Sequence, residues 1–426
     1  MADAKRRHRP VMRLSSRLFA AFLAAGLQAC VTQPLEAPKT VAVPVAEART
    51  PVTILVSIDG FRADYLARGA SPNLSALAAQ GISAAMRPSF PSVTFPNHYT
   101  LVTGLRPDRN GIVGNRMEDP RRPGQLFTMQ TDDPFWWTGA EPIWASAEKA
   151  GIPTATMFWP GSNVDLGGVR PHDWQQFAGA INDRQRVDGI IDWLRRPAAT
   201  RPRFLTLYFD EVDHAGHEFG PDDARTTAAV RSVDAAIGRL VSELAALGQP
   251  ANLVIVADHG MAAVSPDRLI LLSDSVSPAD GRVVTDGAYA GIEPLPGRDA
   301  ALAAALLKPG AHHKCWRKAD IPAALHYGRH LRVPAFICLA EPGWLLIAQP
   351  PTADKPFRLG GTHGYDPADP RMAALFIAAG PGIRPIGRIA SFDNVDIAPL
   401  LRDLIGLPAG RDLDGDDAPF RAALRR

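Results

Sequence analysis

The chain has 426 residues, with 46 Lys and Arg against 44 Asp and Glu, and it is 46% hydrophobic and 21% charged. This composition is ordinary for a globular protein and excludes a disordered chain, a coiled coil and a polytopic membrane protein. The formal net charge of +2 gives no support to nucleic-acid binding as the main role. We therefore expect no nucleic-acid polymer as a partner.

The N-terminus predicts a signal peptide over residues 1–29. Six basic residues and one acidic residue precede the apolar run Leu18–Leu27, which a small residue, Ala29, follows. A basic start, a short apolar run and a small residue are typical of secretory signals, and about ten apolar residues are too few to anchor a chain across a bilayer. Cys30 follows as in a bacterial lipoprotein box. We expect an exported, periplasmic protein with a lipid anchor at Cys30 in the outer membrane; an ordinary cleaved signal is the alternative.

Residues 30–51 are Pro-rich and weakly patterned, which predicts a stalk before the folded domain. Only two cysteines follow, Cys315 and Cys338. In an exported chain they predict a disulfide that closes a loop of about 23 residues and stabilises the fold by roughly 3 kcal/mol. Two buried free thiols are the alternative.

Short apolar, β-branched runs predict the strands of a buried sheet. Near-continuous apolar strands are typical of parallel or mixed sheets covered by helices on both faces. The predicted strands are Val52–Ile58, Phe204–Phe209, Leu253–Ala257 and Ala373–Ala379. Helical patterns lie between them, at Ser71–Gln80, which begins with a Ser cap and a Pro, and at Thr226–Leu247. The predicted fold class is α/β, doubly wound, with ligands expected at the carboxyl ends of the strands.

One segment interrupts this pattern. Residues 265–355 are Pro-broken, less regular and contain both remaining cysteines. We interpret them as an insertion or cap that sets specificity rather than chemistry. The predicted catalytic domain is 52–411, and 412–426 is predicted as a C-terminal tail.

Acidic and histidine side chains gather at the predicted strand ends. The candidates are three Asp and three His: Asp59, Asp213, His217, Asp258, His259 and His363. His217 follows Asp213 by four residues, so a helical turn places both on one face. Mixed Asp and His ligands with open positions suit catalytic zinc, and six ligands suffice for two ions. Taken one at a time, each of these residues is equally compatible with a helix cap or a surface position.

Thr94 stands just before Phe95 and Pro96, and the sequence from Pro96 predicts a helix. Pro suits the first turn of a helix, which puts Thr94 near the N-terminal cap, where backbone N–H groups favour an anion. Local sequence does not separate a capping hydroxyl from a nucleophile.

Several motifs together resemble the nucleotide pyrophosphatase/phosphodiesterase family of the alkaline phosphatase superfamily. They occur in the family's order and cover most of residues 52–405. The matching segments are Ser57–Arg62 (SIDGFR), Thr94–Thr100 (TFPNHYT), Gly104-Leu105, Gly111–Met117 (GIVGNRM), Glu211–Pro221 (EVDHAGHEFGP), Ala257–Met261 (ADHGM) and Gly361–Asp366 (GTHGYD). The resemblance implies an alkaline-phosphatase-like, mostly parallel sheet covered by helices on both faces, with a smaller cap.

The resemblance also implies roles for individual residues. One Zn²⁺ is expected on Asp213, His217 and His363, and a second on Asp59, Asp258 and His259 with Thr94. Thr94 is the implied nucleophile. Asn115 is the implied donor to a phosphate oxygen. Phe95 and Tyr208 match the aromatic pair that holds a nucleobase, and Trp159 resembles a further pocket aromatic.

The predicted function is hydrolysis of nucleotide phosphodiester or pyrophosphate bonds through a covalent nucleotidyl-threonine, with release of a nucleoside 5′-monophosphate. The alternatives on the same fold are a phosphomonoesterase, a phospholipid-headgroup phosphodiesterase and a phosphonate hydrolase. A non-catalytic envelope lipoprotein is a further alternative, against which all six ligands and Thr94 argue.

Other residues compete for these roles. Asp210 and His214 lie beside the chosen ligands, which we prefer because their spacing matches the family pattern. His98 is interpreted as a supporting or helix-packing residue, and Asp234 as a residue on a helix face. The run His312, His313 and Cys315 looks like a metal site but belongs to the insertion, where we interpret it as surface and disulfide context.

Overall fold

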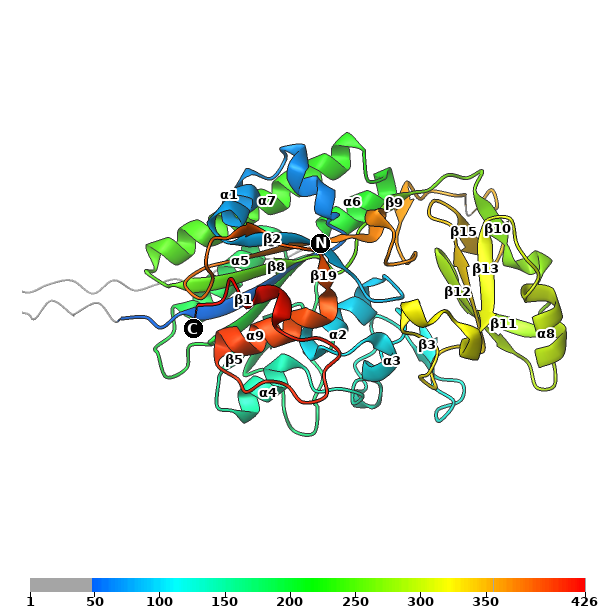
Figure 1. Cartoon of the computed structure of the whole chain (residues 1–426), viewed down its shortest axis with the longest axis horizontal. Helices are drawn as coiled ribbons and strands as arrows, with labels where there is room; N and C mark the ends of the chain where they lie inside the picture. The colour runs from blue at the N-terminus through cyan, green and yellow to red at the C-terminus, as the bar shows by residue number, and fades with distance from the viewer. Residues whose placement is uncertain (1–47, 355, 426) are drawn as a thin grey trace, which may run out of the picture. The chain divides into compact units, whose positions relative to one another are not determined.

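The computed structural model describes residues 48–354 and 356–425. The predicted signal peptide, Cys30 and most of the predicted stalk lie outside these residues. A nine-stranded sheet forms the centre of the fold (Figure 1). Its order is β18 (Gly387–Arg388), β2 (Ile82–Arg87), β17 (Ala374–Ala379), β8 (Ala251–Val256), β1 (Val52–Ile58), β7 (Phe204–Phe209), β5 (Thr154–Met157) and β6 (Asp173–Gln175), and β19 (Phe392–Asp393) also pairs with β2.

The sheet is mostly parallel because its strands are buried on both faces. Every residue of β1 is buried, and β1 runs parallel to both β7 and β8. The antiparallel strand is β17, which lies between β2 and β8. Continuous apolar runs of this kind are stable only when helices cover both sides. The predicted α/β class and mostly parallel sheet are therefore confirmed.

Helices form a layer on each face of the sheet (Figure 1). One layer contains α1 (Pro72–Gln80), α5 (Asp183–Leu194), α6 (Glu211–Phe219) and α7 (Ala224–Ala246), which contact one another through α7. The other contains α2 (Thr94–Thr103), α3 (Pro107–Asn110), α4 (Ile143–Lys149) and α9 (Ile397–Ile405). The helices α1 and α7 match the two helices predicted from sequence to within two residues at each end.

Asp234 joins the first layer together. It lies within α7 and is 2% exposed, and its carboxylate accepts hydrogen bonds from the backbone N–H groups of Asn73 and Leu74 at 3.2 and 2.8 Å. It therefore caps the N-terminus of α1 from a neighbouring helix, which satisfies donors that a helix cannot pair internally. The interpretation of Asp234 as a residue on a helix face missed this role, because the two segments are far apart in sequence.

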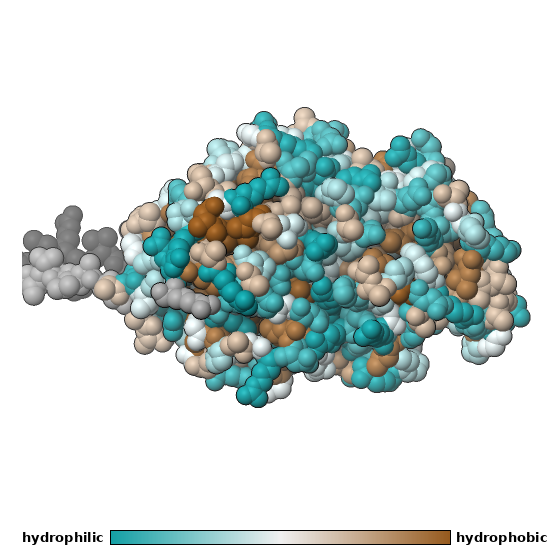
Figure 2. All heavy atoms as spheres, in the orientation of Figure 1, coloured by the Kyte–Doolittle hydropathy of each residue, from teal (hydrophilic) through white to brown (hydrophobic). Residues whose placement is uncertain are grey.

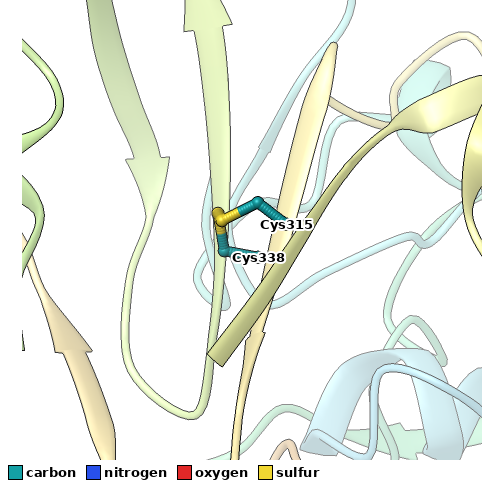
Figure 3. Close-up of a disulfide and its surroundings, with 2 residues drawn as sticks. All are labelled: Cys315 and Cys338. Atoms are coloured by element: carbon teal, nitrogen blue, oxygen red, sulfur yellow. A yellow bond between two sulfur atoms is a disulfide. The ribbon is translucent and has the colours of Figure 1, made fainter. Parts of the chain in front are cut away.

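The segment predicted as an insertion contains its own small sheets, at the right of Figure 1. Among the described residues, its strands pair with one another and not with the central sheet. They are β10 (Leu269–Leu271) with β15 (Leu345–Ile347), and β11 (Gly281–Thr285), β12 (Tyr289–Pro294), β14 (Phe336–Ala340) and β13 (His313–Arg317) in that order, with α8 (Asp299–Leu306) between β12 and β13. Cys315 and Cys338 face each other across β13 and β14 and form a disulfide (Figure 3).

Two short pairs complete the fold: β3 (Met117–Glu118) with β4 (Leu126–Phe127), and β9 (Ala262–Ala263) with β16 (Gly361–Thr362). The residues predicted as a C-terminal tail differ from that expectation, because Phe420 is fully buried and its ring lies 5.4 Å from Phe376 of β17 and 4.9 Å from Phe392. Burial of an aromatic ring of this size anchors the C-terminal segment to the core.

The surface in the view of Figure 2 is mostly hydrophilic, with hydrophobic side chains in separate small patches. Exposed large apolar side chains such as Ile386 and Trp174 come from different parts of the chain. Within the described ranges, no helix has both the length and the apolar character needed to span a bilayer.

Candidate active site

The carboxyl ends of three adjacent strands meet at one edge of the sheet. Asp59 directly follows β1, and Asp258 with His259 follows β8. Asp213 lies on α6, which begins two residues after β7 ends. Since β1 pairs in parallel with both neighbours, these side chains arrive at the same place, as predicted from the sequence.

Helix α6 approaches this edge closely because Gly60 has no side chain. Gly60 adopts φ = +67°, and a Cβ there would lie 2.9 Å from the Cα of Asp213. On α6, Asp213 and His217 are one turn apart, and the carboxylate Oδ2 lies 3.4 Å from Nε2 of His217. The Gly-Thr strand β16 then places His363 beside them, with its Nε2 3.0 Å from Nε2 of His217.

The orientation of the three imidazoles is set by backbone carbonyls. Nδ1 of His217, His259 and His363 lies 3.0 Å from the carbonyl oxygens of Gly361, Gly260 and Ser92 respectively. A carbonyl only accepts hydrogen bonds, so each Nδ1 carries a proton and each Nε2 presents a lone pair. The lone pairs of His217 and His363 therefore face each other at 3.0 Å, which requires a cation or a proton between them.

The carboxylates lead to the same conclusion. Oδ1 of Asp59, Oδ1 of Asp213 and Oδ2 of Asp258 are buried without a hydrogen-bond partner among the described residues. Burial, reinforced by Asp258 and Asp213, raises the pKa of Asp59 well above its ordinary value. Buried charges persist in proteins when they are paired or coordinate metals. Unpartnered carboxylate oxygens and aligned Nε2 lone pairs fit divalent cations such as zinc.

The six predicted ligands form one cluster, and the structure separates the two predicted metal sites less clearly than was predicted from the sequence. Asp213, His259 and His363 offer ligand atoms within 4.8 Å of one another, as do Asp59, His98 and Asp258. Nε2 of His259 is also 3.4 Å from Asp59 and 3.0 Å from Asp258. His259 thus lies where both predicted sites meet.

His98 contacts the cluster without a free lone pair to offer it. Its Nδ1 lies 2.9 Å from the carbonyl oxygen of Thr94 and 3.3 Å from Oδ2 of Asp258, and its Nε2 lies 2.9 Å from Oγ of Ser57. Nδ1 therefore carries the proton, and Nε2 accepts a hydrogen bond from the Ser57 hydroxyl. Both nitrogens are used, so His98 joins Ser57 to the first turn of α2 and lies beside Asp258.

Thr94 is the first residue of α2, not a cap preceding it. The helix begins two residues earlier than predicted, because Pro96 in the first turn needs no hydrogen-bond partner for its nitrogen. The Thr94 hydroxyl lies 3.4 Å from Nε2 of His259. Asn115 lies beside it, where the side-chain Oδ1 accepts a hydrogen bond from the N–H of Phe95 at 2.8 Å. This bond leaves the amide N–H groups of Asn115 free to donate elsewhere.

A cavity of about 460 Å³ opens from Thr94 and the candidate metal-binding cluster. Its walls are rich in aromatic side chains: Phe95, Trp137, Phe158, Trp159, Phe177 and Tyr208. The predicted pocket residues Phe95, Tyr208 and Trp159 thus line one cavity. The ring of Phe95 packs 6.0 Å from that of Trp137. Trp159 is almost fully buried, and its indole N–H donates to the carbonyl of His98.

Tyr208 has a second contact that sequence reasoning did not anticipate. Its hydroxyl donates a hydrogen bond to Oδ2 of Asp59 at 2.6 Å. Burial and the Asp59 carboxylate raise the pKa of Tyr208 well above its ordinary value, so the hydroxyl remains a donor. Tyr208 therefore links the aromatic wall to a predicted metal ligand.

Phe177 was missed by sequence reasoning. It lines the cavity, is 51% exposed, and packs with ring centroids 5.4 Å from Phe158 and 6.1 Å from Tyr208. It follows β6 in a polar stretch and belongs to none of the recognised motifs. No local periodicity signals it; a half-exposed aromatic in a cavity is visible only in three dimensions.

The competing candidates lie apart from the cluster. The side chain of His214 is 80% exposed, and its Nε2 lies 3.8 Å from Oε2 of Glu218. Asp210 lines the cavity but forms an ion pair with Arg186 at 2.7 Å. His312 stacks on Trp344 within the segment predicted as an insertion. These contacts leave the six chosen residues as the metal-binding candidates.

Comparisons with known proteins point to one family. Residues 53–366 match the family described as type I phosphodiesterase / nucleotide pyrophosphatase. The chain is 36% identical over 363 residues to a bis(5'-adenosyl)-triphosphatase of Xenopus laevis, covering 84% of this chain and 78% of that one. It is 34% identical over 378 residues to ectonucleotide pyrophosphatase/phosphodiesterase family member 1 of Mus musculus, covering 85% of this chain and 41% of the longer relative.

Solved structures show the same likeness. Human ectonucleotide pyrophosphatase/phosphodiesterase 5 superposes with a TM-score of 0.83 at 29% identity, covering 88% of this chain and 100% of that one. An inactive variant of the murine protein in complex with AMP gives the same TM-score, identity and coverage.

Proposed function

Because this chain belongs to the type I phosphodiesterase / nucleotide pyrophosphatase family, we propose that it hydrolyses nucleotide phosphodiester and pyrophosphate bonds and releases nucleoside 5′-monophosphates. The observation that carries this proposal is the position of Thr94. Its hydroxyl lies 3.4 Å from Nε2 of His259, within a cluster of three Asp and three His, and lines an aromatic cavity. Hydroxyl, ligands and aromatic wall are the three parts that nucleotidyl transfer to a side chain needs.

The cluster would hold two zinc ions. We assign one to Asp213, His217 and His363, and the other to Asp59, Asp258 and His259 with the Thr94 hydroxyl. Bound divalent ions supply Lewis-acid chemistry: they lower the pKa of a coordinated hydroxyl and neutralise charge on a transferring phosphoryl group. The unpartnered oxygens of the three carboxylates support this assignment.

Thr94 is the proposed nucleophile. Its Oγ1 forms a bond to phosphorus while the bond to the leaving-group oxygen breaks, and the hydroxyl proton passes through solvent to the departing oxygen. Water then attacks phosphorus, the bond to Oγ1 breaks, Thr94 regains a proton and the nucleoside 5′-monophosphate departs. The first turn of α2 supports this role, because its backbone N–H groups favour negative charge beside Thr94.

Asn115 is the proposed donor to the phosphate. Its Oδ1 is held by the N–H of Phe95, which fixes the amide plane and points Nδ2 the other way. A donor fixed in advance stabilises charge as it develops, without reorganisation. The same hydrogen bond ties Asn115 to the residue next to the nucleophile.

The aromatic wall supports a nucleoside substrate over bare phosphate. Stacking of one base on an aromatic ring contributes roughly 1–3 kcal/mol. Phe95 and Tyr208, the predicted aromatic pair, line the same cavity as the half-exposed Phe177, so we propose that these three rings hold the base. The AMP complex of the murine relative supports a nucleotide ligand.

A substrate panel tests the proposal. The panel compares thymidine 5′-monophosphate p-nitrophenyl ester with p-nitrophenyl phosphate, p-nitrophenylphosphocholine and a phosphonate monoester. We expect kcat/KM for the nucleotide ester to be at least about tenfold higher than for the other three, since one stacked base is worth about that factor. Preference for p-nitrophenyl phosphate, p-nitrophenylphosphocholine or a phosphonate monoester would instead identify a phosphomonoesterase, a phospholipid-headgroup phosphodiesterase or a phosphonate hydrolase.

Substitution of Thr94 tests the mechanism. Thr94→Ala should abolish turnover and leave zinc content unchanged, while Thr94→Ser, which keeps a hydroxyl, should retain part of the activity. With a labelled nucleotide substrate, acid quenching should trap label covalently on the wild-type protein and none on Thr94→Ala. Most of the activity surviving in Thr94→Ala would exclude this residue as the nucleophile.

We further propose that the enzyme acts outside the cytoplasm, anchored in a bacterial outer membrane by lipid on Cys30. The disulfide between Cys315 and Cys338 supports an oxidising compartment, and the relatives named ectonucleotide pyrophosphatases support export. Metabolic labelling with a palmitate analogue tests the anchor: label on the wild type and none on Cys30→Ser is the expected result. An unlabelled wild type would leave a cleaved, unanchored protein.

A further inference from the structure

Arg186 lies behind the aromatic wall of the cavity, and its side chain is only 3% exposed. It belongs to α5, and its guanidinium donates hydrogen bonds to the end of β7, to the residue that follows β7 and to the segment before α5. Its Nη1 donates to the carbonyl of Tyr208 at 3.1 Å and to the carboxylate of Asp210 at 2.7 Å. Its Nε donates to the carbonyl of Ile181 at 2.9 Å. The planar guanidinium thereby fixes the end of β7 against the start of α5.

The same guanidinium packs against two rings of the wall. Its central carbon lies 5.0 Å from the ring centroid of Phe158 and 5.9 Å from that of Phe177. Phe158 adopts φ = +65°, a left-handed conformation that is unfavourable for a bulky residue and persists only where the surroundings impose it. Phe177 is half-exposed and contacts Phe158 edge to face at 5.4 Å. An exposed ring of this kind needs support from behind to keep one orientation.

We infer that Arg186 is a positioning residue for nucleoside binding: it holds Phe158 in its strained conformation and, both through Phe158 and by its own contact, fixes Phe177 at the cavity. The inference rests on the proposed nucleotide substrate. Arg186 does not line the cavity, and neither Phe158 nor Phe177 is a candidate metal ligand. Its effect should therefore fall on binding of the nucleoside part of the substrate and not on the phosphoryl chemistry at Thr94.

Arginine suits this position better than lysine. A guanidinium is planar, donates several hydrogen bonds in fixed directions and stacks on aromatic faces, whereas an ammonium is a point charge on a flexible stem. Lys at position 186 would keep the charge that balances Asp210 and the nearby buried Asp183, whose Oδ1 is 3.8 Å from Nη1. It would lose the flat surface beneath Phe158. Arg186→Lys therefore separates the stacking role from the charge.

The experiment compares KM and kcat for two diesters, thymidine 5′-monophosphate p-nitrophenyl ester and bis(p-nitrophenyl) phosphate. In Arg186→Lys we expect KM for the nucleotide ester to rise about tenfold, the effect of losing one ordered base stack. The kcat for the nucleotide ester, and both KM and kcat for bis(p-nitrophenyl) phosphate, should remain nearly unchanged. Arg184→Lys is the matched control, because Arg184 is exposed on the same helix. Equal losses on both substrates would overturn the inference.

A double-mutant cycle with Phe177→Ala tests the route. If Arg186 acts through Phe177, Arg186→Lys should add little to the KM of Phe177→Ala, and additive effects would overturn the inference. If Arg186→Lys does not fold, Phe158→Leu, which removes the intervening ring without disturbing a charge, should give the same split between substrates. A wild type without preference for the nucleotide ester would refute the proposed function; a wild-type preference that survives in Arg186→Lys and Phe158→Leu would refute this inference alone.

Discussion

Tyr208 has two separable roles, and Tyr208→Phe distinguishes them. The ring lines the cavity, whereas the hydroxyl donates to Oδ2 of Asp59 at 2.6 Å. Phenylalanine keeps the ring and removes the donor. If the hydroxyl supports a metal ligand, the variant should bind zinc more weakly and still bind the nucleoside normally.

The size of the effect follows from the contact. A hydrogen bond to a charged group contributes about 1.5–3 kcal/mol, and Asp59 is almost fully buried, so water does not replace the lost donor. Loss of such a support for a ligand weakens metal binding by about 10- to 100-fold. The hydrogen bond also lowers the pKa of Asp59, which burial raises well above its ordinary value. Without it that pKa rises further, protons compete more strongly with zinc, and the affinity deficit should grow as the pH falls.

The assay is a titration of activity with buffered free zinc, together with metal analysis of the dialysed protein. Tyr208→Phe should need about 10- to 100-fold more free zinc for half-maximal activity, and its KM for a nucleotide ester at saturating zinc should match the wild type. Tyr327→Phe is a matched control, because its buried hydroxyl donates to the carbonyl of Val113, away from the cluster. A wild-type zinc curve combined with a raised KM would show that Tyr208 serves the base and not Asp59.

Three further predictions concern metal, proton and disulfide. Chelation should inactivate the enzyme, zinc should restore activity better than magnesium, and full activity in chelator would contradict the metal site. Burial and Asp183 raise the pKa of Glu211 from 4.5 to about 8, so the wild type loses stability as pH rises between these two values. The thermal stability of Glu211→Gln relative to the wild type should therefore increase from about pH 4.5 to about pH 8 and level off above it, and a pH-independent difference would refute this reasoning. Replacing Cys315 and Cys338 together by Ala should lower the free energy of unfolding by about 3 kcal/mol in a denaturant titration, and an unchanged midpoint would contradict it.

The sequence predicted the central sheet because the signals are local. An apolar run that ends in Asp, as at Asp59 and Asp258, marks both a buried strand and its carboxyl end. Parallel pairing then brings the carboxyl ends of these strands together, so the sequence alone predicts that the candidate ligands lie close to one another. His363 was harder to place by physical reasoning, because a Gly-rich loop has no fixed direction; its motif supplied the expectation.

What escaped prediction depends on contacts between distant segments. Asp234 caps a helix that begins 162 residues earlier in the chain, and Phe420 packs on strands of the central sheet. Neither contact leaves a periodic trace in its own segment. The start of α2 was predicted two residues too late, since the helix begins at Thr94 and Pro96 is compatible with several positions in a first turn.

The cluster also links catalysis to the completed fold. Its ligands come from the ends of β1 and β8, from α6 and from the loop after β16, so no single supersecondary unit contains the site. Without cations the charged forms of Asp59 and Asp213 are unfavourable, because burial first and the Asp258 carboxylate next raise the pKa of each. Metal binding should therefore stabilise the assembled sheet edge as well as activate Thr94. A substitution that loosens the packing of any of these elements should weaken metal binding before it unfolds the protein. The reason is that metal affinity depends on the distances between ligands that lie on different elements.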